Sequence, residues 1–322
     1  MRTSIALCTW NGAAFLEQQL GSLAAQTRMP DELVICDDAS GDGTLAIIEA
    51  FASHAPFPVR LHRNPTRLGT KRNFEQAMAR CTGDLIFLCD QDDVWHPGKI
   101  ASMSNAFERD GDLGCLFTDA RQIDEKGNPL EHSLWDHIGF ALRERQRVRS
   151  GRAFDVLVEH NVVTGATMAF RARWRESILP IGEAPDMLHD QWIALLLSAI
   201  AKLSCVDAQL VDYRQHAAQQ VGVGAAAGGV RRWVAAARDT GAEEYAVHAA
   251  QLEAALQRLE AIGAPSTRLD ELRGRIAHLR MRASLSPRRL ARVGAVMREL
   301  ASLRYHRYSN HFWSAAKDLF WS

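Results

Sequence analysis

The sequence contains no long apolar run, no excess of charge of either sign and no nucleic-acid-binding motif. Its longest apolar stretch, around Ile193–Ala201, is much shorter than the about 20 residues that a membrane-spanning helix needs. The opening Met1–Ile5 leads directly into a strand-like segment instead of the hydrophobic stretch of a signal peptide. Lys and Arg total 38, as do Asp and Glu. We therefore expect a cytoplasmic protein with no nucleic-acid partner.

The cysteines are few, and their spacing excludes a disulfide-stabilised scaffold and a zinc-stabilised one. The six cysteines show neither a disulfide framework nor the pairs typical of a zinc site. Several fall inside apolar segments, where cysteine behaves as a small core residue. The pattern indicates a reducing compartment. The residues are Cys8, Cys36, Cys81, Cys89, Cys115 and Cys205.

The first 120 residues alternate between short apolar segments and segments of helical spacing. This alternation predicts an α/β fold with a Rossmann-like, mostly parallel sheet flanked by helices. The expected strands are Ser4–Thr9, Leu33–Cys36, Val59–His62, Leu85–Cys89 and Gly114–Thr118. The expected helices are Ala14–Ala25, Thr44–Ser53, Asn73–Arg80 and one that opens at Pro97-Gly98.

The later part of the chain is less regular and ends in a helical region. We expect one domain at residues 1–225, with halves of about 1–120 and 121–225, and a basic helical appendage at 226–322. The expected features between them are a solvated basic segment (Arg143–Arg152), a strand (Thr164–Phe170), a buried helix (Gln191–Ala201), a last strand (Leu210–Arg214) and a flexible linker (His216–Gly229).

A cluster of acids at the end of one apolar segment is the strongest functional signal. Leu85–Cys89 suits a strand buried on both faces, and Asp90, Asp92 and Asp93 follow it directly. Open α/β sheets place ligands at the carboxyl ends of their strands. Crowded carboxylates repel one another unless a cation offsets them, and Mg²⁺ or Mn²⁺ prefers such oxygen ligands. The cluster predicts a metal-bound phosphate compound; an exposed acidic loop is the alternative.

Three other polar segments are expected to meet this cluster. Thr9-Trp-Asn-Gly12 can offer backbone N–H groups to a nucleotide, or can simply turn from strand to helix. The acids of Asp37–Thr44 can accept hydrogen bonds from a ribose or a base, or can form a turn that caps the next helix. The cations of Arg67–Asn73 can neutralise a diphosphate, or can begin a solvated helix.

Together, in this order, the segments resemble the family 2 glycosyltransferases, enzymes of the GT-A fold that use nucleotide sugars. The resemblance covers about residues 3–216. It is strongest at Asp37-Asp38-Ala-Ser, at Gly69 with Asn73-Phe74, and at Asp90-Gln-Asp-Asp-Val-Trp95. The last motif is similar to that of a subgroup that includes bacterial rhamnosyltransferases of surface-polysaccharide assembly.

The resemblance implies roles on the donor side. Thr9, Asn11 and Gln91 would help to bind the nucleotide sugar. Asp38 would contact the nucleoside, and Arg72 would lie near the base or the diphosphate. Among the acids, Asp90 would reach the ribose or the metal, Asp92 would ligate Mn²⁺ or Mg²⁺, and Asp93 would support them or cap a helix. His216 of Tyr213-Arg-Gln-His216 would approach the diphosphate or the metal.

The resemblance also implies an acceptor side. Thr164-Gly165-Ala166-Thr167 is similar to the turn at which a small residue lets the backbone approach a sugar. In Leu188-His-Asp-Gln-Trp192, Asp190 would deprotonate the acceptor hydroxyl, and capping the following helix is its alternative role. The residues implied on this side are Gly165, Thr167, His189 and Trp192, besides Asp190.

The function implied is an inverting, metal-dependent transfer of a sugar, with rhamnose as one candidate, from a dTDP- or UDP-sugar. The acceptor would be a hydroxyl of a growing, lipid-linked bacterial surface glycan. Two alternatives stay open on the residues alone. One is a metal-dependent sugar nucleotidyltransferase, although Thr9-Trp-Asn-Gly12 lacks the basic residue that such enzymes usually carry. The other is a non-catalytic sugar-binding scaffold.

The end of the chain is strongly basic. From Arg273 onward, eleven Lys and Arg residues stand against Glu299 and Asp318, which gives about +9 for this segment and about −9 for the rest. Apolar and aromatic residues are interleaved with the arginines, and Trp313 and Trp321 lie near the end. Such a segment fits an anionic membrane surface, which would make the protein peripheral, or it packs on a domain or a subunit.

Overall fold

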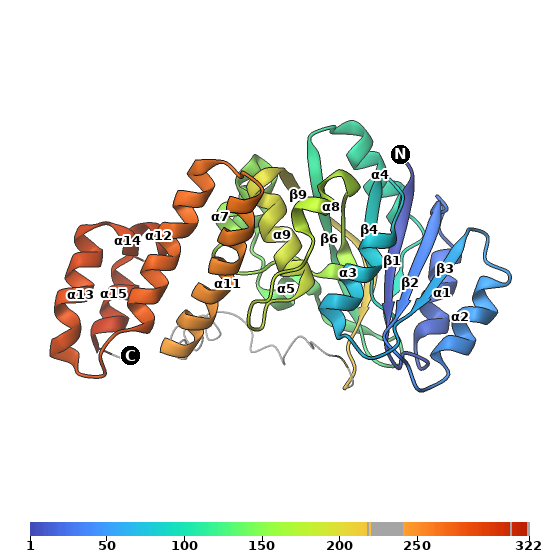
Figure 1. Cartoon of the computed structure of the whole chain (residues 1–322), viewed down its shortest axis with the longest axis horizontal. Coiled ribbons are helices and arrows are strands. Elements are labelled where there is room, and N and C mark those ends of the chain that lie inside the picture. Colours follow the sequence, from blue (N-terminus) through green and yellow to red (C-terminus); the bar gives the residue numbers. More distant parts are fainter. Residues whose placement is uncertain (218, 220–240, 310, 321–322) are drawn as a thin grey trace. The chain divides into compact units, whose positions relative to one another are not determined.

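The computed structural model describes residues 1–217, 219, 241–309 and 311–320, and the chain divides into two compact units (Figure 1). The first unit comprises Met1–Ile181 and Leu188–Gly224, and the second comprises Gly182–Met187 and Ala225–Ser322. The predicted boundary at 225/226 and most of the predicted linker lie outside the described residues.

Within the described residues, the first unit is built on a nine-stranded sheet of order β3-β2-β1-β4-β8-β6-β9-β5, with β7 beside β6. The strands are β1 (Thr3–Thr9), β2 (Glu32–Asp37), β3 (Val59–Arg63), β4 (Leu85–Cys89), β5 (Val94–Trp95), β6 (Leu113–Ile123), β7 (Pro129–Ser133), β8 (Met168–Arg171) and β9 (Lys202–Arg214). The five predicted strands of the first 120 residues are confirmed, with small shifts at their ends.

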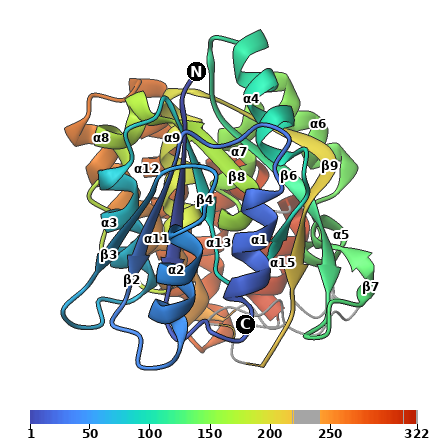
Figure 2. The same ribbon diagram turned by 90° about the vertical axis from the view of Figure 1, so that its right-hand side faces the viewer.

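The N-terminal half of this sheet is parallel. β1 lies between β2 and β4, so that Leu7 stands opposite both Ile35 and Cys89. Every residue of β1, β2 and β4 is buried, because helices cover both faces of these strands. Figures 1 and 2 show α1 (Leu16–Ala24) and α2 (Thr44–Ala52) on one face of these strands, and Figure 1 shows α3 (Thr70–Arg80) on the other. The carboxyl ends of three neighbouring strands therefore reach one edge together.

The second half of the sheet differs from a simple parallel continuation. β8 runs antiparallel between β4 and β6, although it follows β4 by about eighty residues in the chain. The predicted strand Thr164–Phe170 is wrong in its first part, because Gly165–Thr167 forms a 3₁₀ turn. In this turn the carbonyl of Thr164 accepts hydrogen bonds from the N–H and the hydroxyl of Thr167. The turn brings a small loop to the edge at which β4 ends.

The segment between β6 and β8 is helical and more ordered than its basic sequence suggested. It contains α5 (Leu134–Ile138), α6 (Leu142–Arg147), a π-helical turn (Val148–Arg152) and α7 (Ala153–Leu157). Arg149 pairs with Asp207 at 2.5 Å, and Val148 is fully buried. The predicted solvated character of Arg143–Arg152 is confirmed for most of its residues, and only Val148 is buried; several of its arginines also pair with acids of neighbouring elements.

The buried helix and the last strand are confirmed. α9 (His189–Ile200) begins two residues earlier than predicted, and β9 extends from Lys202 to Arg214 along β6. Two further helices complete the described part of this unit: α4 (Lys99–Arg109) follows the acid cluster, and α8 (Arg175–Ile178) precedes α9.

The second unit is helical where it is described. Its helices are α11 (Ala242–Ala261), α12 (Ser266–Ala283), α13 (Arg289–Ala301), α14 (Arg304–Tyr308) and α15 (His311–Phe320). Gly263, with φ of 70°, ends the turn before α12, because a left-handed backbone suits glycine. Among the described residues, no helix is long and apolar enough to cross a membrane.

A buried ion pair joins two helices of this second unit. The guanidinium of Arg282 donates two hydrogen bonds to the carboxylate of Asp318, at 2.8 and 2.9 Å, and the hydroxyl of Tyr305 donates a third at 2.7 Å. Asp318 is completely buried and Arg282 nearly so. Removing one partner leaves the other charge without compensation, which is costly in a protein interior.

Asp318→Ala should therefore lower the free energy of unfolding of the second unit by about 3–5 kcal/mol. Glu253→Ala is the matched control, because Glu253 pairs with Arg280 at a site where both side chains are more than a third exposed. Its cost should stay below about 1 kcal/mol. Urea unfolding followed by circular dichroism measures both values, and equal losses would contradict the assignment of Asp318 as a buried support.

Candidate active site

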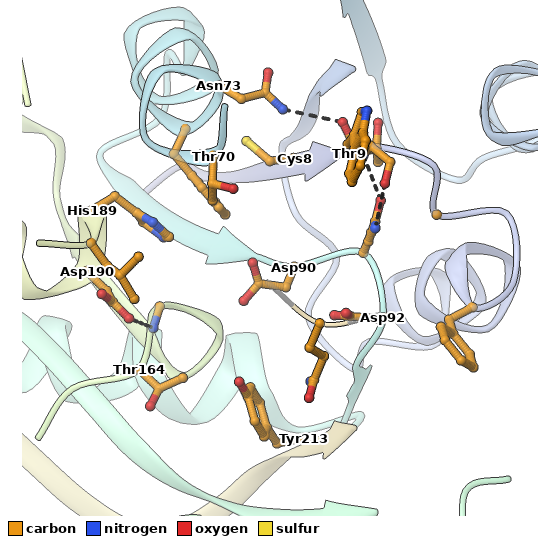
Figure 3. A pocket seen from close by; sticks show the side chains of 18 of the residues that line it. Cys8, Thr9, Thr70, Asn73, Asp90, Asp92, Thr164, His189, Asp190 and Tyr213 are labelled. Carbon is orange, nitrogen blue, oxygen red and sulfur yellow. Dashed lines mark hydrogen bonds between the residues drawn. The ribbon is translucent and has the colours of Figure 1, made fainter. Parts of the chain in front are cut away.

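A cavity of about 700 Å³ opens at the carboxyl ends of β1, β2 and β4 (Figure 3). All of its lining residues belong to the first unit. The sequence-predicted residues that line it are Thr9, Asn11, Asp38, Asp90, Gln91, Asp92, Gly165, His189, Asp190 and His216. Arg72, Thr167 and Trp192 were predicted but do not line it.

Asp38 organises the loop that leads to α3. Its carboxylate accepts hydrogen bonds from the backbone N–H groups of Leu68 and Gly69, at 2.7 and 2.8 Å, and from the amide of Asn64 at 2.9 Å. Gly69 has φ of 84°, a backbone conformation that glycine adopts without strain. The side chain thus fixes the loop over residues 64–69 and still lines the cavity.

Asn73 belongs to the Gly69…Asn73-Phe74 motif, and the sequence alone gave its side chain no role in binding or catalysis. It is buried, its side-chain N–H₂ donates to the carbonyl of Cys36 at 2.8 Å, and its Oδ1 accepts from Asn64 at 2.9 Å. It also lines the cavity. The Asn73 amide therefore links the end of β2 to the start of α3.

Gln91 holds together the loops that follow β1 and β4. Its Oε1 accepts from the N–H of Trp10 at 2.8 Å, and its Nε2 donates to the carbonyl of Trp10 at 3.1 Å. A Cβ added at Gly12 would come within 2.2 Å of Oε1 of Gln91, so a larger residue there would displace the Gln91 amide from its hydrogen bonds to Trp10. Asn11 accepts a hydrogen bond from the N–H of Gly41 at 2.9 Å. These contacts preform the mouth of the cavity.

The acids after β4 lie in an environment that penalises their charge. Burial raises the pKa of Asp90 to about 8, and the neighbouring Asp92 and Asp190 add to the shift, while Lys99 opposes it. Burial, Asp92 and Asp90 also raise the pKa of the Asp93 carboxyl. Asp93 accepts from the N–H of Arg214 at 3.0 Å through Oδ1, whereas its buried Oδ2 has no partner in the described structure. Without a bound cation, burial and mutual repulsion therefore disfavour the ionised forms of Asp90 and Asp93.

The buried side chain of Arg214 stabilises the loop that follows β4. Its guanidinium donates to the carbonyls of Asp92, Asp124 and Glu125 and to the side chain of Gln18, at 2.6 to 3.1 Å. The side chain is 1% exposed. It ties the loop after β4 to the end of β6.

Asp92 and His216 are the residues best placed to hold a cation. The Nε2 of His216 lies 2.9 Å from Oδ2 of Asp92, and both line the cavity. The residues that the structure describes contain no group of three or more His, Cys, Asp or Glu that could hold a metal ion. Mg²⁺ and Mn²⁺ commonly combine one or two carboxylates with phosphate oxygens and water. This donor set fits a cation that shares its coordination with a diphosphate.

Asp190 lies across the cavity from this pair, and Figure 3 shows Asp90, Asp92 and Asp190 around the same space. Leu188, and not Asp190, is the N-cap of α9, so the capping alternative is wrong. Asp190 instead stands in the first turn, where the helix dipole favours a carboxylate. Its Oδ2 accepts from the N–H of Gly165 at 2.9 Å and its Oδ1 from the N–H of Gln191 at 2.7 Å. The carboxylate is thereby oriented and the turn at Gly165 is fixed.

His189 packs beside Asp190. Its ring stacks on Phe74 at 3.9 Å between ring centroids, and burial lowers its pKa, which keeps the imidazole neutral. Neither ring nitrogen has a hydrogen-bond partner among the described residues. A Cβ added at Gly165 would lie 2.9 Å from Nε2 of His189, so a larger residue would push this ring.

The three predicted residues outside the cavity have structural partners. Arg72 donates to Glu75 at 2.7 Å and lies near the carbonyl of Ile181. The indole of Trp192 is buried and donates to the carbonyl of Ile178 at 2.8 Å, and the hydroxyl of Thr167 donates to the carbonyl of Thr164. These contacts shape the walls around the site.

Lys99 was missed by the sequence reasoning. Its ammonium is completely buried, donates to the carbonyl of Ala166 at 2.5 Å and lies 3.5 Å from the centre of the Trp95 ring. Burial lowers its pKa to about 7, against the opposing effects of Cys89, Asp93 and Asp90. Only the fold shows this contact, because Lys99 and Ala166 are far apart in the sequence.

Comparisons with known proteins agree with the family that the sequence resembles. The sequence profile described as "Glycosyl transferase family 2" matches residues 4–177. An uncharacterized protein of Mycobacterium tuberculosis is 26% identical over 216 residues, which are 66% of this chain and 59% of that protein. The chain therefore spans less than two thirds of the length of this curated relative.

Two solved structures share the architecture. TarS 1–349 of S. aureus, in complex with UDP-GlcNAc, superposes with a TM-score of 0.58 at 15% identity, over 99% of this chain and 88% of that one. The mannosyltransferase PcManGT of Pyrobaculum calidifontis, in complex with GDP-Man and Mn²⁺, gives 0.51 at 17% identity, over 99% and 87%. At such identities the likeness shows the fold, which is the predicted GT-A fold. Because the family profile covers more than half of the 322 residues, the chain belongs to glycosyl transferase family 2.

Proposed function

We propose that this protein transfers a sugar from a nucleoside-diphosphate sugar to a hydroxyl group of a growing bacterial surface glycan, with inversion at the anomeric carbon. The observation that carries the proposal is one cavity that holds the acids after β4 on one side and the oriented carboxylate of Asp190 on the other. The donor would be a dTDP- or UDP-sugar, with rhamnose as the first sugar to test. The acceptor would be lipid-linked and reached from the cytoplasmic side of the membrane.

The donor would occupy the part of the cavity formed by the loops after β1, β2 and β4. Asp38, Thr9 and Asn11 line this part, and they are the groups available to the nucleoside. Each oxygen of the Asp38 carboxylate accepts bonds from the protein, which fixes its position before any ligand arrives. Asp90 and Gln91 would face the ribose and the diphosphate.

A divalent cation would be held by Asp92 and His216 together with the diphosphate. When bound, such a cation offsets the charge that develops on the leaving group. The crowding of Asp90, Asp92 and Asp190 around the cavity supports this role, because a bound cation would offset the repulsion between these acids. PcManGT contains Mn²⁺ in its complex with GDP-Man.

Asp190 would act as the general base. Its two oxygens accept the N–H groups of Gly165 and Gln191, so the carboxylate points in one fixed direction along the wall of the cavity. It would take the proton of the acceptor hydroxyl as the oxygen attacks the anomeric carbon. The bond to the diphosphate breaks on the opposite face, and a single displacement of this kind inverts the anomeric centre.

Lys99 would act as a positioning residue between the two halves of the site. Its ammonium binds the carbonyl of Ala166, next to the Gly165 that Asp190 holds, and the acids Asp90 and Asp93 influence its pKa. A single buried cation thus links the turn on the acceptor side to the acids on the donor side.

A panel of nucleotide sugars tests the function directly. In the presence of Mn²⁺, a true donor should raise the melting temperature, because it binds the folded state preferentially. Turnover of that donor should release a nucleoside diphosphate; release of pyrophosphate would instead indicate nucleotidyl transfer. The absence of both products with every donor that binds would support a scaffold.

Asp190→Asn should reduce kcat by about 10²–10⁴-fold, since a general base typically contributes that much. Donor KM should change by less than about threefold, because the amide can still accept the N–H of Gly165. Asp112→Asn, at an exposed acid in the same unit, should leave both constants unchanged. Steady-state kinetics with the donor found in the panel decide the matter, and normal kcat in Asp190→Asn refutes the assignment.

Asp92→Asn should weaken the binding of UDP or dTDP about tenfold or more when Mn²⁺ is present, a loss of about 1.4 kcal/mol. In EDTA the variant and the parent protein should bind equally, because the lost interaction runs through the cation. Isothermal titration calorimetry in both conditions gives the comparison. A loss of equal size in EDTA would mean that Asp92 contacts the nucleotide itself.

Lys99→Met should lower stability by about 1–3 kcal/mol, because it leaves the buried carbonyl of Ala166 without a donor. The amides of Gly165 and Thr167 should exchange hydrogen faster, and kcat should fall more than donor binding. Lys202→Met is the control, since Lys202 pairs with Asp110 at a largely exposed site. If amide exchange at residues 165–168 is unchanged, Lys99 does not hold the turn.

A further inference from the structure

The second unit carries an apolar face that its own packing leaves uncovered. On α13, Leu290 is 90% exposed, Met297 55% and Val293 43%. Their spacing of three and four residues places them on one side of the helix. The opposite side contains Arg292, Val296 and Glu299, all buried. The inner side of α13 is therefore covered by the rest of the second unit, and a second apolar stripe on the same helix stays exposed.

A second group of exposed apolar residues, all aromatic, lies on the neighbouring helix. Phe312, Trp313 and Phe320 of α15 are 67%, 83% and 54% exposed. α13 and α15 pack together through a small core that includes Val296 and Ala315. Figure 1 shows α13, α14 and α15 side by side within the second unit. Exposed Trp and Phe are costly in water and are typical of sites that meet another apolar phase.

The exposed charges of α13 and of the turn before it are of one sign. From Leu285 to Phe320 the acids are Glu299 and Asp318, and both are buried in pairs with His278, Arg282 and Arg304. The exposed cations of this segment include Arg288, Arg289 and Arg298, whereas Arg307 pairs with Glu271 of α12. Since no acid of this segment reaches the surface, the face offers positive charge beside apolar side chains.

We infer that this face of the second unit, formed by the outer side of α13 and the aromatic residues of α15, binds the surface of an anionic phospholipid bilayer. Interfacial helices bind in this way: apolar and aromatic side chains enter the headgroup region while Arg and Lys pair with acidic lipids. A protein partner would usually be met by charges of both signs. The inference extends the proposed function, since a lipid-linked acceptor lies at such a surface. Its test uses binding alone, so the two can fail separately.

The structure also divides the predicted amphipathic tail into two roles. Leu279 and Val296 are buried inside the unit, whereas Leu290, Trp313 and Phe320 are exposed. The basic segment therefore packs on itself and still presents a lipid-like surface.

Sedimentation with vesicles tests the inference on the full chain. The protein should sediment with phosphatidylglycerol-containing vesicles, should not sediment with pure phosphatidylcholine, and should be released by high salt. The triple variant Arg288→Gln, Arg289→Gln, Arg298→Gln should weaken binding on the order of 100-fold, since each cation near the surface contributes about fivefold. The double variant Leu290→Ser, Trp313→Ser should also lose binding.

Leu142→Ser is the matched control, because Leu142 is 62% exposed in the first unit and lies outside the face. It should bind vesicles as the parent protein does. Equal sedimentation with neutral and anionic vesicles, or none with either, would overturn the inference. Light scattering after size-exclusion chromatography tests the remaining alternative, in which a second copy of this chain binds the face. If Leu290→Ser converts an oligomer into a monomer, the face binds a second copy and the inference is wrong.

Discussion

The crowding of carboxylates at the end of β4 is the constraint on which the rest of the site depends. Burial and the neighbouring Asp92 raise the pKa of Asp90 and of Asp93, which favours their neutral forms. Carboxylates this close together stay ionised only where cations or hydrogen-bond donors stabilise them. Arg214 and Lys99 supply that support from two sides, through the backbone of Asp92 and through the turn at Ala166. The repulsion between the acids that these two residues do not offset acts beside the cavity. A bound cation, shared with a diphosphate, would offset it there.

The polar residues of the donor side act first on one another. Asp38 fixes the loop at Leu68 and Gly69, and Gln91 fixes Trp10. These hydrogen bonds cross between loops that follow different strands, so the mouth of the cavity has one shape before a ligand binds. Preorganisation of this kind lowers the entropy cost of binding and places the reacting groups at fixed positions. On the acceptor side, the contact between Asp190 and Gly165 does the same.

The segment from Arg288 to Phe320 separates its charges by sign and by depth. Its acids Glu299 and Asp318 are buried in ion pairs with side chains of neighbouring helices, and Arg288, Arg289 and Arg298 lie at the surface. One set of residues therefore stabilises the unit, and the other remains available for a partner. The same helices serve both purposes because a helix has two sides, and α13 carries apolar residues on each.

The sequence by itself determined the N-terminal strands, the acid cluster and most of the polar residues to which it assigned a place in the site. Leu85–Cys89 was predicted to the residue, because a buried parallel strand leaves a continuous apolar run that local patterning reveals. Tertiary structure alone decided the antiparallel β8 between β4 and β6, the contact of Lys99 with Ala166 and the pairing of Arg72 with Glu75 instead of a place in the cavity. Each of these depends on which segments meet after folding, and distant contacts leave no periodic signal in the chain.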